Sequence, residues 1–200
     1  QLIIYPSFKK YSDSKFKSFH SSYTNKMFFI VASSSLYKYR ALDMFGVKIN
    51  KSDKIMLIFF TLVCVALRIS FVEKDLLQHD LAAYLVPAES LLTHHGFLDQ
   101  SGQKMAFSAP LYPVLIAIFK KIFGVFWVEP LIAFQCFLLF ATGLLLKKFI
   151  QMYDTKLAQF GAYILIFNPN SLGAAHALQT ETVFTFFLFW STLTFVAFLK

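Results

Sequence analysis

Four long apolar runs constrain the folds available to this chain more than any other feature. They lie at about residues 55–72, 130–146, 157–175 and 181–199. A helix of about 20 apolar residues crosses the roughly 30 Å hydrocarbon core of a bilayer. Apolar residues make up 57% of the chain and charged residues 15%, whereas soluble domains average about 45–50% and about 25%. The sequence therefore predicts an all-α, polytopic transmembrane helical bundle, and so an integral, multi-pass membrane protein.

Basic residues before the first run indicate the orientation of the chain. Residues 1–54 hold ten Lys or Arg against three Asp, a net charge of +7. Next to a membrane span, such charge marks the cytoplasmic side and contacts anionic lipid. We therefore expect a cytoplasmic N-terminus, with membrane lipids and not nucleic acid as partners. Residues 1–43 show no clear periodicity and form a basic segment whose role the sequence does not reveal, and residues 44–200 form the membrane domain.

Segment 73–109 is expected to be an outer loop on the opposite side of the membrane. It carries five acidic residues and only two lysines, as the positive-inside rule predicts for a loop outside the cytoplasm. Apolar residues near helical spacing predict a short helix over 81–93, and Gly96 is a suitable stop for it. The first extracytoplasmic loop is therefore expected to be partly helical.

Residues 111–127 suit a helix along the membrane interface better than a span. A spanning helix would place Lys120 and Lys121 near the bilayer centre, at a cost of roughly 2.5–3.5 kcal/mol each. It would also leave Lys147 and Lys148 outside the cytoplasm. An interfacial juxtamembrane helix avoids both problems, and residues 130–146 then cross inward.

The third run is interrupted by the sequence Asn168-Pro169-Asn170. The bilayer core tolerates such a break only where protein or water satisfies the backbone. If the spans alternate in direction, Glu181 begins the fourth run at its outer end. Charge bias therefore places Asp80, Tyr112 and Glu181 on the same face of the membrane, where ionisable groups tend to be functional.

Each candidate group also has a purely structural interpretation. Asp80 suits the N-cap position of the loop helix, and Glu181 interacts favourably with the dipole of its own helix. Arg68 can snorkel to the interface. The adjacent pair His94-His95 lacks a spaced partner set, so no metal site is predicted from it.

Other sequence signatures narrow the choice of chemistry. Cys64 and Cys136 both fall inside apolar runs, so a disulfide framework is not expected. The chain has no P-loop, no glycine-rich dinucleotide fingerprint and no nucleophile elbow.

The order of the short motifs resembles a known family. Asp80-x-Ala-x-Tyr84 follows the first span, and Pro110-Leu-Tyr-Pro113 and Phe123-Gly124 come later in the chain. Pro169 then precedes Leu178-x-Thr-Glu181-x-x-Phe184. This order resembles the N-terminal part of the GT-C membrane glycosyltransferases, and within them the protein O-mannosyltransferase and lipid A aminoarabinose transferase branch. The resemblance covers roughly residues 52–199.

The resemblance implies inverting transfer of a sugar from a polyprenyl-phosphate donor to a lipid, glycan or protein acceptor on the extracytoplasmic or luminal face. Asp80 matches the acidic position of the family and would act as general base. The next residue is Leu81, so the second acid of the family's Asp-Glu pair is missing. That absence weakens a paired-carboxylate metal site and leaves a divalent metal as an open alternative, not an expected cofactor.

Five further residues receive substrate-binding roles from the same resemblance. The departing lipid phosphate needs a cation nearby, and Arg68 and Lys74 are the local candidates. Tyr84 and Tyr112 belong to the loop and juxtamembrane motifs, and Glu181 resembles the acidic position near the lipid-phosphate pocket.

A non-catalytic membrane protein, either a transporter or an assembly subunit, is the alternative. The Asn168-Pro169-Asn170 break and Glu181 would then form a midplane site of the kind that broken helices build. The partly helical outer loop around Asp80 favours the enzyme. We expect the bacterial inner membrane rather than the endoplasmic reticulum, and a fragment of a longer protein that is inactive alone.

Overall fold

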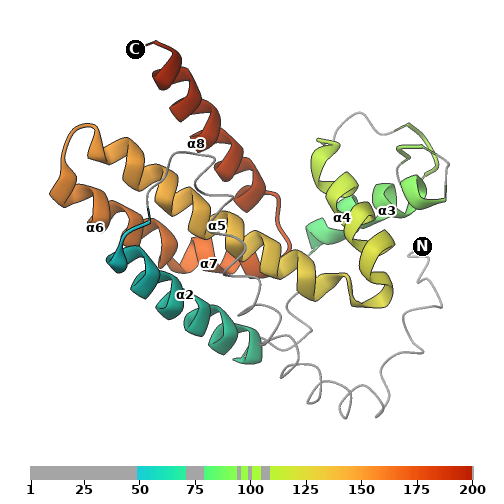
Figure 1. Ribbon diagram of the computed structural model, residues 1–200. Coiled ribbons are helices and arrows are strands. Elements are labelled where there is room, and N and C mark those ends of the chain that lie inside the picture. The colour runs from blue at the N-terminus through green and yellow to red at the C-terminus, as the bar shows by residue number, and fades with distance from the viewer. Residues whose placement is uncertain (1–48, 71–78, 94–95, 99–100, 105–108, 200) are drawn as a thin grey trace. The chain divides into compact units, whose positions relative to one another are not determined.

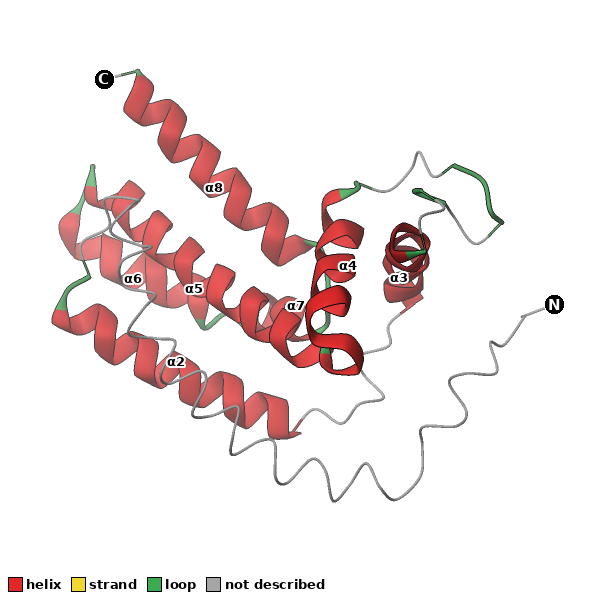
Figure 2. Ribbon diagram, turned by 45° about the vertical axis from the view of Figure 1, so that its right-hand side comes forward, coloured by secondary structure: helices red, strands yellow, loops and turns green. Residues whose placement is uncertain are grey.

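A computed structural model describes residues 49–70, 79–93, 96–98, 101–104 and 109–199, without the side chains of residues 79–82. The helices are α2 (Lys51–Ser70), α3 (His79–Leu92), α4 (Leu111–Phe123), the short 3₁₀ helix η2 (Gly124–Phe126), α5 (Val128–Gln151), α6 (Thr155–Ile166), α7 (Pro169–His176) and α8 (Glu181–Phe198) (Figure 1). The described part of the chain contains helices and loops but no strand (Figure 2). The prediction of an all-α fold is confirmed for these residues.

Helix α5 is the central element of the described bundle. It packs against α2, α6, α7 and α8, and its middle, from Leu138 to Leu145, is buried on every side. A helix that is apolar all round is typical of a core or of a membrane span. Helices α5 and α6 approach each other closely at Gly143. A Cβ added at this glycine would overlap the side chain of Ile166 on α6.

Two described helices, α5 and α8, are long and apolar enough to cross a membrane. Helix α5 is mostly buried in the protein, whereas α8 is mostly exposed. Only the first turns of α8 pack against the bundle, through Thr182, Val183 and Phe186. Its distal part extends away from the other helices (Figures 1 and 2) and exposes large side chains such as Phe195 and Phe198.

The two other expected spans are not confirmed by the described helices. Helix α2 has 20 residues but includes four charged residues, at positions 51, 53, 54 and 68. The run at 157–175 is divided into α6, of 12 residues, and α7, of 8 residues. The division falls at Asn168, whose side chain accepts hydrogen bonds from the backbone N–H groups of Asn170 and Ser171. Neither helix alone reaches the length of about 20 residues that a span needs.

Helices α2 and α5 run antiparallel, with an ion pair at each end of their contact. At one end the ammonium group of Lys147 donates to the Asp53 carboxylate, and both side chains are buried. At the other end Arg68 donates through Nε to Glu129 at 2.9 Å. Between them, Phe60 packs against a phenylalanine of α5 with ring centroids 5.7 Å apart.

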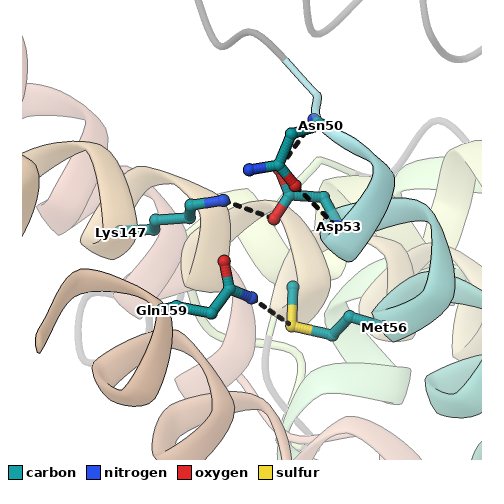
Figure 3. Close-up of polar contacts among 5 residues, drawn as sticks. All are labelled: Asn50, Asp53, Met56, Lys147 and Gln159. Atoms are coloured by element: carbon teal, nitrogen blue, oxygen red, sulfur yellow. Dashed lines mark hydrogen bonds and ion pairs between the residues drawn. The ribbon is translucent and has the colours of Figure 1, made fainter. Parts of the chain in front are cut away.

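Asp53 also belongs to the N-terminal cap of α2 (Figure 3). The backbone N–H of Asn50 donates to Asp53 Oδ2 at 3.0 Å, and the Asp53 N–H donates to Asn50 Oδ1 at 2.9 Å. This reciprocal arrangement is a capping box, which satisfies two backbone donors at the start of a helix. Lys147 therefore binds a carboxylate that the cap already holds in place.

The expected segment 1–43 lies outside the described residues, as does most of the loop before α3. The described helical unit comprises Asn50–Lys200. The helix expected at 81–93 is present as α3, and that expected at 111–127 is present as α4 followed by η2.

Candidate functional site

Gln135 and Tyr112 form a buried polar contact at the Val128 end of α5. Gln135 is 0% exposed and Tyr112 is 2% exposed. The Gln135 Nε2 group donates to Tyr112 Oη at 3.1 Å and to the backbone carbonyl of Gln179 at 2.7 Å. One amide group therefore connects α4, α5 and the turn that leads into α8.

Tyr84, a second predicted site residue, contacts Tyr112, and the charge of Glu181, a third, acts on Tyr112. The ring of Tyr84, on α3, contacts the Tyr112 ring edge to face, with centroids 5.2 Å apart. Glu181 is exposed in the first turn of α8. Burial raises the pKa of Tyr112 above its ordinary value, and the charge of Glu181 acts in the same direction. Tyr112 therefore stays a neutral hydroxyl group at physiological pH.

The backbone before α8 is strained where it meets this contact. Leu178 has φ 54°, a left-handed conformation that is uncommon for residues with a Cβ atom. Its side chain is 2% exposed, so packing holds the conformation in place. The turn places the Gln179 carbonyl on Gln135 and begins α8 two residues later. Strain of this kind persists only where the surrounding structure enforces it, and it clusters at functional sites.

The carbonyl oxygen of the Gln135 side chain is buried and has no hydrogen-bond partner among the described residues. Buried polar atoms in native proteins nearly always have a partner, and an exception calls for an explanation. The NH₂ group of this amide already donates two hydrogen bonds. The oxygen of the amide therefore needs a donor other than Tyr112 and Gln179. A ligand hydroxyl group or an ordered water would satisfy it.

Of the six predicted site residues, Tyr84 and Tyr112 are in contact, and Glu181 acts on Tyr112 through its charge. Arg68 forms an ion pair with Glu129, an acidic residue that sequence reasoning did not consider. Asp80 lies in the first turn of α3, because this helix begins at His79 and not after Asp80. The structure does not describe the side chain of Asp80, and Lys74 lies outside the described residues.

Helices α3 and α4 are joined by a charged contact. Lys120 Nζ binds Glu89 Oε1 at 2.8 Å and lies 5.6 Å from the centroid of the Trp127 ring. A cation over an indole face is attracted by its quadrupole. From the sequence, the charge of Lys120 argued against a spanning helix. In the structure this charge is paired with Glu89 of α3.

Three side chains of types that can bind a metal ion lie close together in another part of the bundle. The ligand atoms of Cys64, Cys136 and His176 lie within 4.8 Å of one another. They come from α2, α5 and α7, and both cysteines are free thiols. His94 and His95, which were weighed as ligands from the sequence, lie outside the described residues.

Sequence reasoning missed Glu129, Gln135 and the Cys–Cys–His cluster. A signal existed for two of these features, because an antiparallel pairing of the first two runs sets Arg68 opposite Glu129 and Cys64 opposite Cys136. Gln135 is a polar amide inside an apolar run, and a buried amide needs hydrogen-bond partners within the protein. Comparison with protein-family models, curated proteins and solved structures found no match.

Proposed function

We propose that this protein is a membrane glycosyltransferase of the GT-C type. It transfers a sugar, with inversion, from a polyprenyl-phosphate donor to an acceptor on the extracytoplasmic or luminal face. The proposal rests on the motif order, on the contact of Tyr84 with Tyr112 beside Gln135, and on Glu181, whose charge acts on Tyr112. In sequence these residues are separated by up to 97 positions, yet the resemblance assigns all of them to one site.

The observation that carries the proposal is the unpaired side-chain oxygen of Gln135. It belongs to the amide that binds the Tyr112 hydroxyl, and the Tyr112 ring in turn contacts Tyr84; tyrosine hydroxyls can bind sugar hydroxyls, and tyrosine rings can pack on the apolar face of a sugar. A hydrogen bond donated by a sugar hydroxyl to this oxygen would complete the hydrogen bonding of the amide. A site built to bind a hydroxyl rejects analogues that lack it, because its own buried polar group is then left unpaired.

The membrane arrangement we propose places this contact at the outer interface. Helix α4 has 13 residues, about 20 Å of helix at 1.5 Å per residue, which suits an interfacial helix better than a span. The antiparallel α2 and α5 put Asp53 and Lys147 at the cytoplasmic end, and Arg68 and Glu129 at the outer end. We also propose that α2 and the α6–α7 segment cross the membrane.

In the reaction we propose, Asp80 on α3 takes the acceptor proton. Arg68 is held at the end of α2 by Glu129, which lies in the first turn of α5. Gln135 lies on the same helix. We propose that this ion pair positions the Arg68 guanidinium group for the leaving phosphate. Lys74 is the second cation. The exposed aromatic face of α8 offers an apolar surface for the polyprenyl chain or for lipid.

The alternative is a transporter or an assembly subunit, and one observation bears on it. A transporter site at the helix break would need backbone groups free to bind an ion or substrate. At the α6–α7 break, the Asn168 side chain binds two N–H groups of α7, and the Phe167 N–H binds the Tyr163 carbonyl. These three backbone donors at the break are therefore used within the chain.

Sugar transfer by membranes that contain the full-length protein tests the proposal, with radiolabelled polyprenyl-phosphate sugars as donors. Gln135→Leu is expected to lower kcat/KM for the donor at least about 10-fold, because a hydrogen bond to the substrate is lost. Thr142→Val is the control, since this buried hydroxyl binds only the Leu138 carbonyl of its own helix in the described contacts. Undiminished transfer by Gln135→Leu, or no transfer by the wild type from any donor, would count against the proposal.

A further inference from the structure

The thiols of Cys64 and Cys136 and the imidazole of His176 form a compact cluster inside the helical bundle. Cys136 and His176 are buried, and Cys64 is partly buried. The Cys136 Sγ atom lies 3.9 Å from His176 Nε2. The cluster lies between the two ion pairs along α2 and α5, and it uses side chains other than those of the Gln135–Tyr112 contact, although Cys136 directly follows Gln135 in the sequence.

The histidine is oriented as a metal ligand requires. Its Nδ1 atom lies 2.8 Å from the Leu172 carbonyl, and its Nε2 atom lies 3.3 Å from the Cys64 carbonyl. A neutral imidazole has one N–H group, and the shorter contact assigns that proton to Nδ1. Nε2 then presents a lone pair toward Cys136 and a carbonyl oxygen, an arrangement that a cation between them would stabilise. Ligand histidines typically donate their other N–H group in this way.

We propose that Cys64, Cys136 and His176 bind a thiophilic divalent metal ion of the zinc class. Two thiolates and a neutral imidazole carry a charge of −2, so a divalent ion makes the site neutral. Neutrality matters because an uncompensated charge in an apolar interior is costly. A monovalent thiophilic ion such as Cu⁺ would leave a net charge of −1 among the buried apolar side chains of α5.

The dimensions of the cluster suit such an ion. Zinc–sulfur distances of about 2.3 Å and zinc–nitrogen distances of about 2.0–2.1 Å, at tetrahedral angles, place sulfur and nitrogen roughly 3.5 Å apart. The observed 3.9 Å between Cys136 Sγ and His176 Nε2 needs a contraction of a few tenths of an ångström. The Cys64 carbonyl oxygen, on the Nε2 side of the ring, is available as a fourth ligand. The bound ion would connect α2, α5 and α7.

Metal binding to the purified full chain in detergent tests the proposal, with Zn²⁺ and Co²⁺ as probes. We expect one Zn²⁺ per chain after dialysis against a weak chelator, and a thiolate-to-Co²⁺ charge-transfer absorption in the wild type. Because both thiols must lose protons on binding, the Zn²⁺ affinity should rise with pH. Cys64→Ser, Cys136→Ser and His176→Gln should each lower the affinity at least about 10-fold.

Thr142→Val is the control, since Thr142 is a buried polar residue of α5 whose hydroxyl donates to the Leu138 carbonyl of its own helix, and its Zn²⁺ affinity should equal that of the wild type. The wild-type Co²⁺ spectrum keeps the test valid even if a cysteine variant does not fold. The proposal fails if the wild type binds no metal, if the Cys64→Ser/Cys136→Ser variant binds Zn²⁺ as tightly as the wild type, or if the purified protein contains a Cys64–Cys136 disulfide.

Discussion

Lys147 and Asp53 are 94 residues apart in sequence and form a buried ion pair between the end of α5 and the start of α2. Their side chains are 6% and 1% exposed. Gln159 of α6 donates to the Met56 sulfur at 3.8 Å close to this pair (Figure 3). Helices α2, α5 and α6 therefore meet at one end of the bundle through polar contacts. The Lys147–Asp53 pair is one of two ion pairs between α2 and α5 among the described residues.

Asp53→Asn should lower the free energy of unfolding in detergent by about 3–5 kcal/mol, because it leaves the buried Lys147 ammonium without a counter-charge. Asparagine keeps the capping interaction of the aspartate, so the change isolates the loss of charge. The double variant Asp53→Leu/Lys147→Leu should recover most of the stability. Chemical denaturation monitored by circular dichroism measures both. A single variant as stable as the wild type would show that the pair is not buried in the protein.

Exchange of the charges at Arg68 and Glu129 separates structure from chemistry. Arg68→Glu alone should destabilise the fold by about 1.5–3 kcal/mol, the usual contribution of hydrogen bonds to charged groups. Arg68→Glu/Glu129→Arg should restore most of this stability while leaving sugar transfer strongly reduced, because the cation then extends from α5. Thermal stability in detergent and a transfer assay on the same preparations provide the two readouts. Full activity in the double variant would exclude a phosphate-binding role for Arg68.

Gly143→Ala should destabilise the α5–α6 contact, because the new methyl group would overlap the side chain of Ile166. Gly173→Ala is the matched control, since nothing lies within 4 Å of a Cβ at that helical position. The control should be neutral or more stable by up to about 1 kcal/mol, from helix propensity. Combination with Ile166→Ala should make the cost of Gly143→Ala smaller than in the wild-type background. Equal effects of the two glycine substitutions would contradict the packing.

The sequence reveals much of the helical pattern, because apolar runs and breaking residues act locally. Asn168-Pro169 ends one helix and begins the next as expected, and the helix around Tyr84 follows from its apolar spacing. Charge alone argued that Lys120 is not in a span, and the structure pairs it with Glu89. The start of α3 is less readable, since the backbone continues the helix through His79 and Asp80.

Contacts between helices could not be read in the same way. Glu129 was not considered from the sequence, and the antiparallel register of α2 and α5 brings it to Arg68. Lys147 was read as a mark of the cytoplasmic side, but it is buried against Asp53. The cluster of Cys64, Cys136 and His176 needs three helices to be placed at once. The φ of Leu178 depends on packing around a turn, which no local residue preference predicts.

Asp80→Asn in the full-length protein, assayed in membranes with radiolabelled polyprenyl-phosphate sugars, is the most direct test of the glycosyltransferase proposal. Asp154→Asn is the control, since Asp154 caps α6 by accepting from the Lys156 and Leu157 N–H groups, a role that asparagine also performs. We expect label to reach an acceptor in the wild type and in Asp154→Asn. In Asp80→Asn, expressed at the same level, transfer should fall about 100-fold or more, in keeping with the loss of a general base. Equal transfer by Asp80→Asn and the wild type would contradict the assignment of Asp80 as the base, and no transfer by the wild type from any donor would contradict the proposed function.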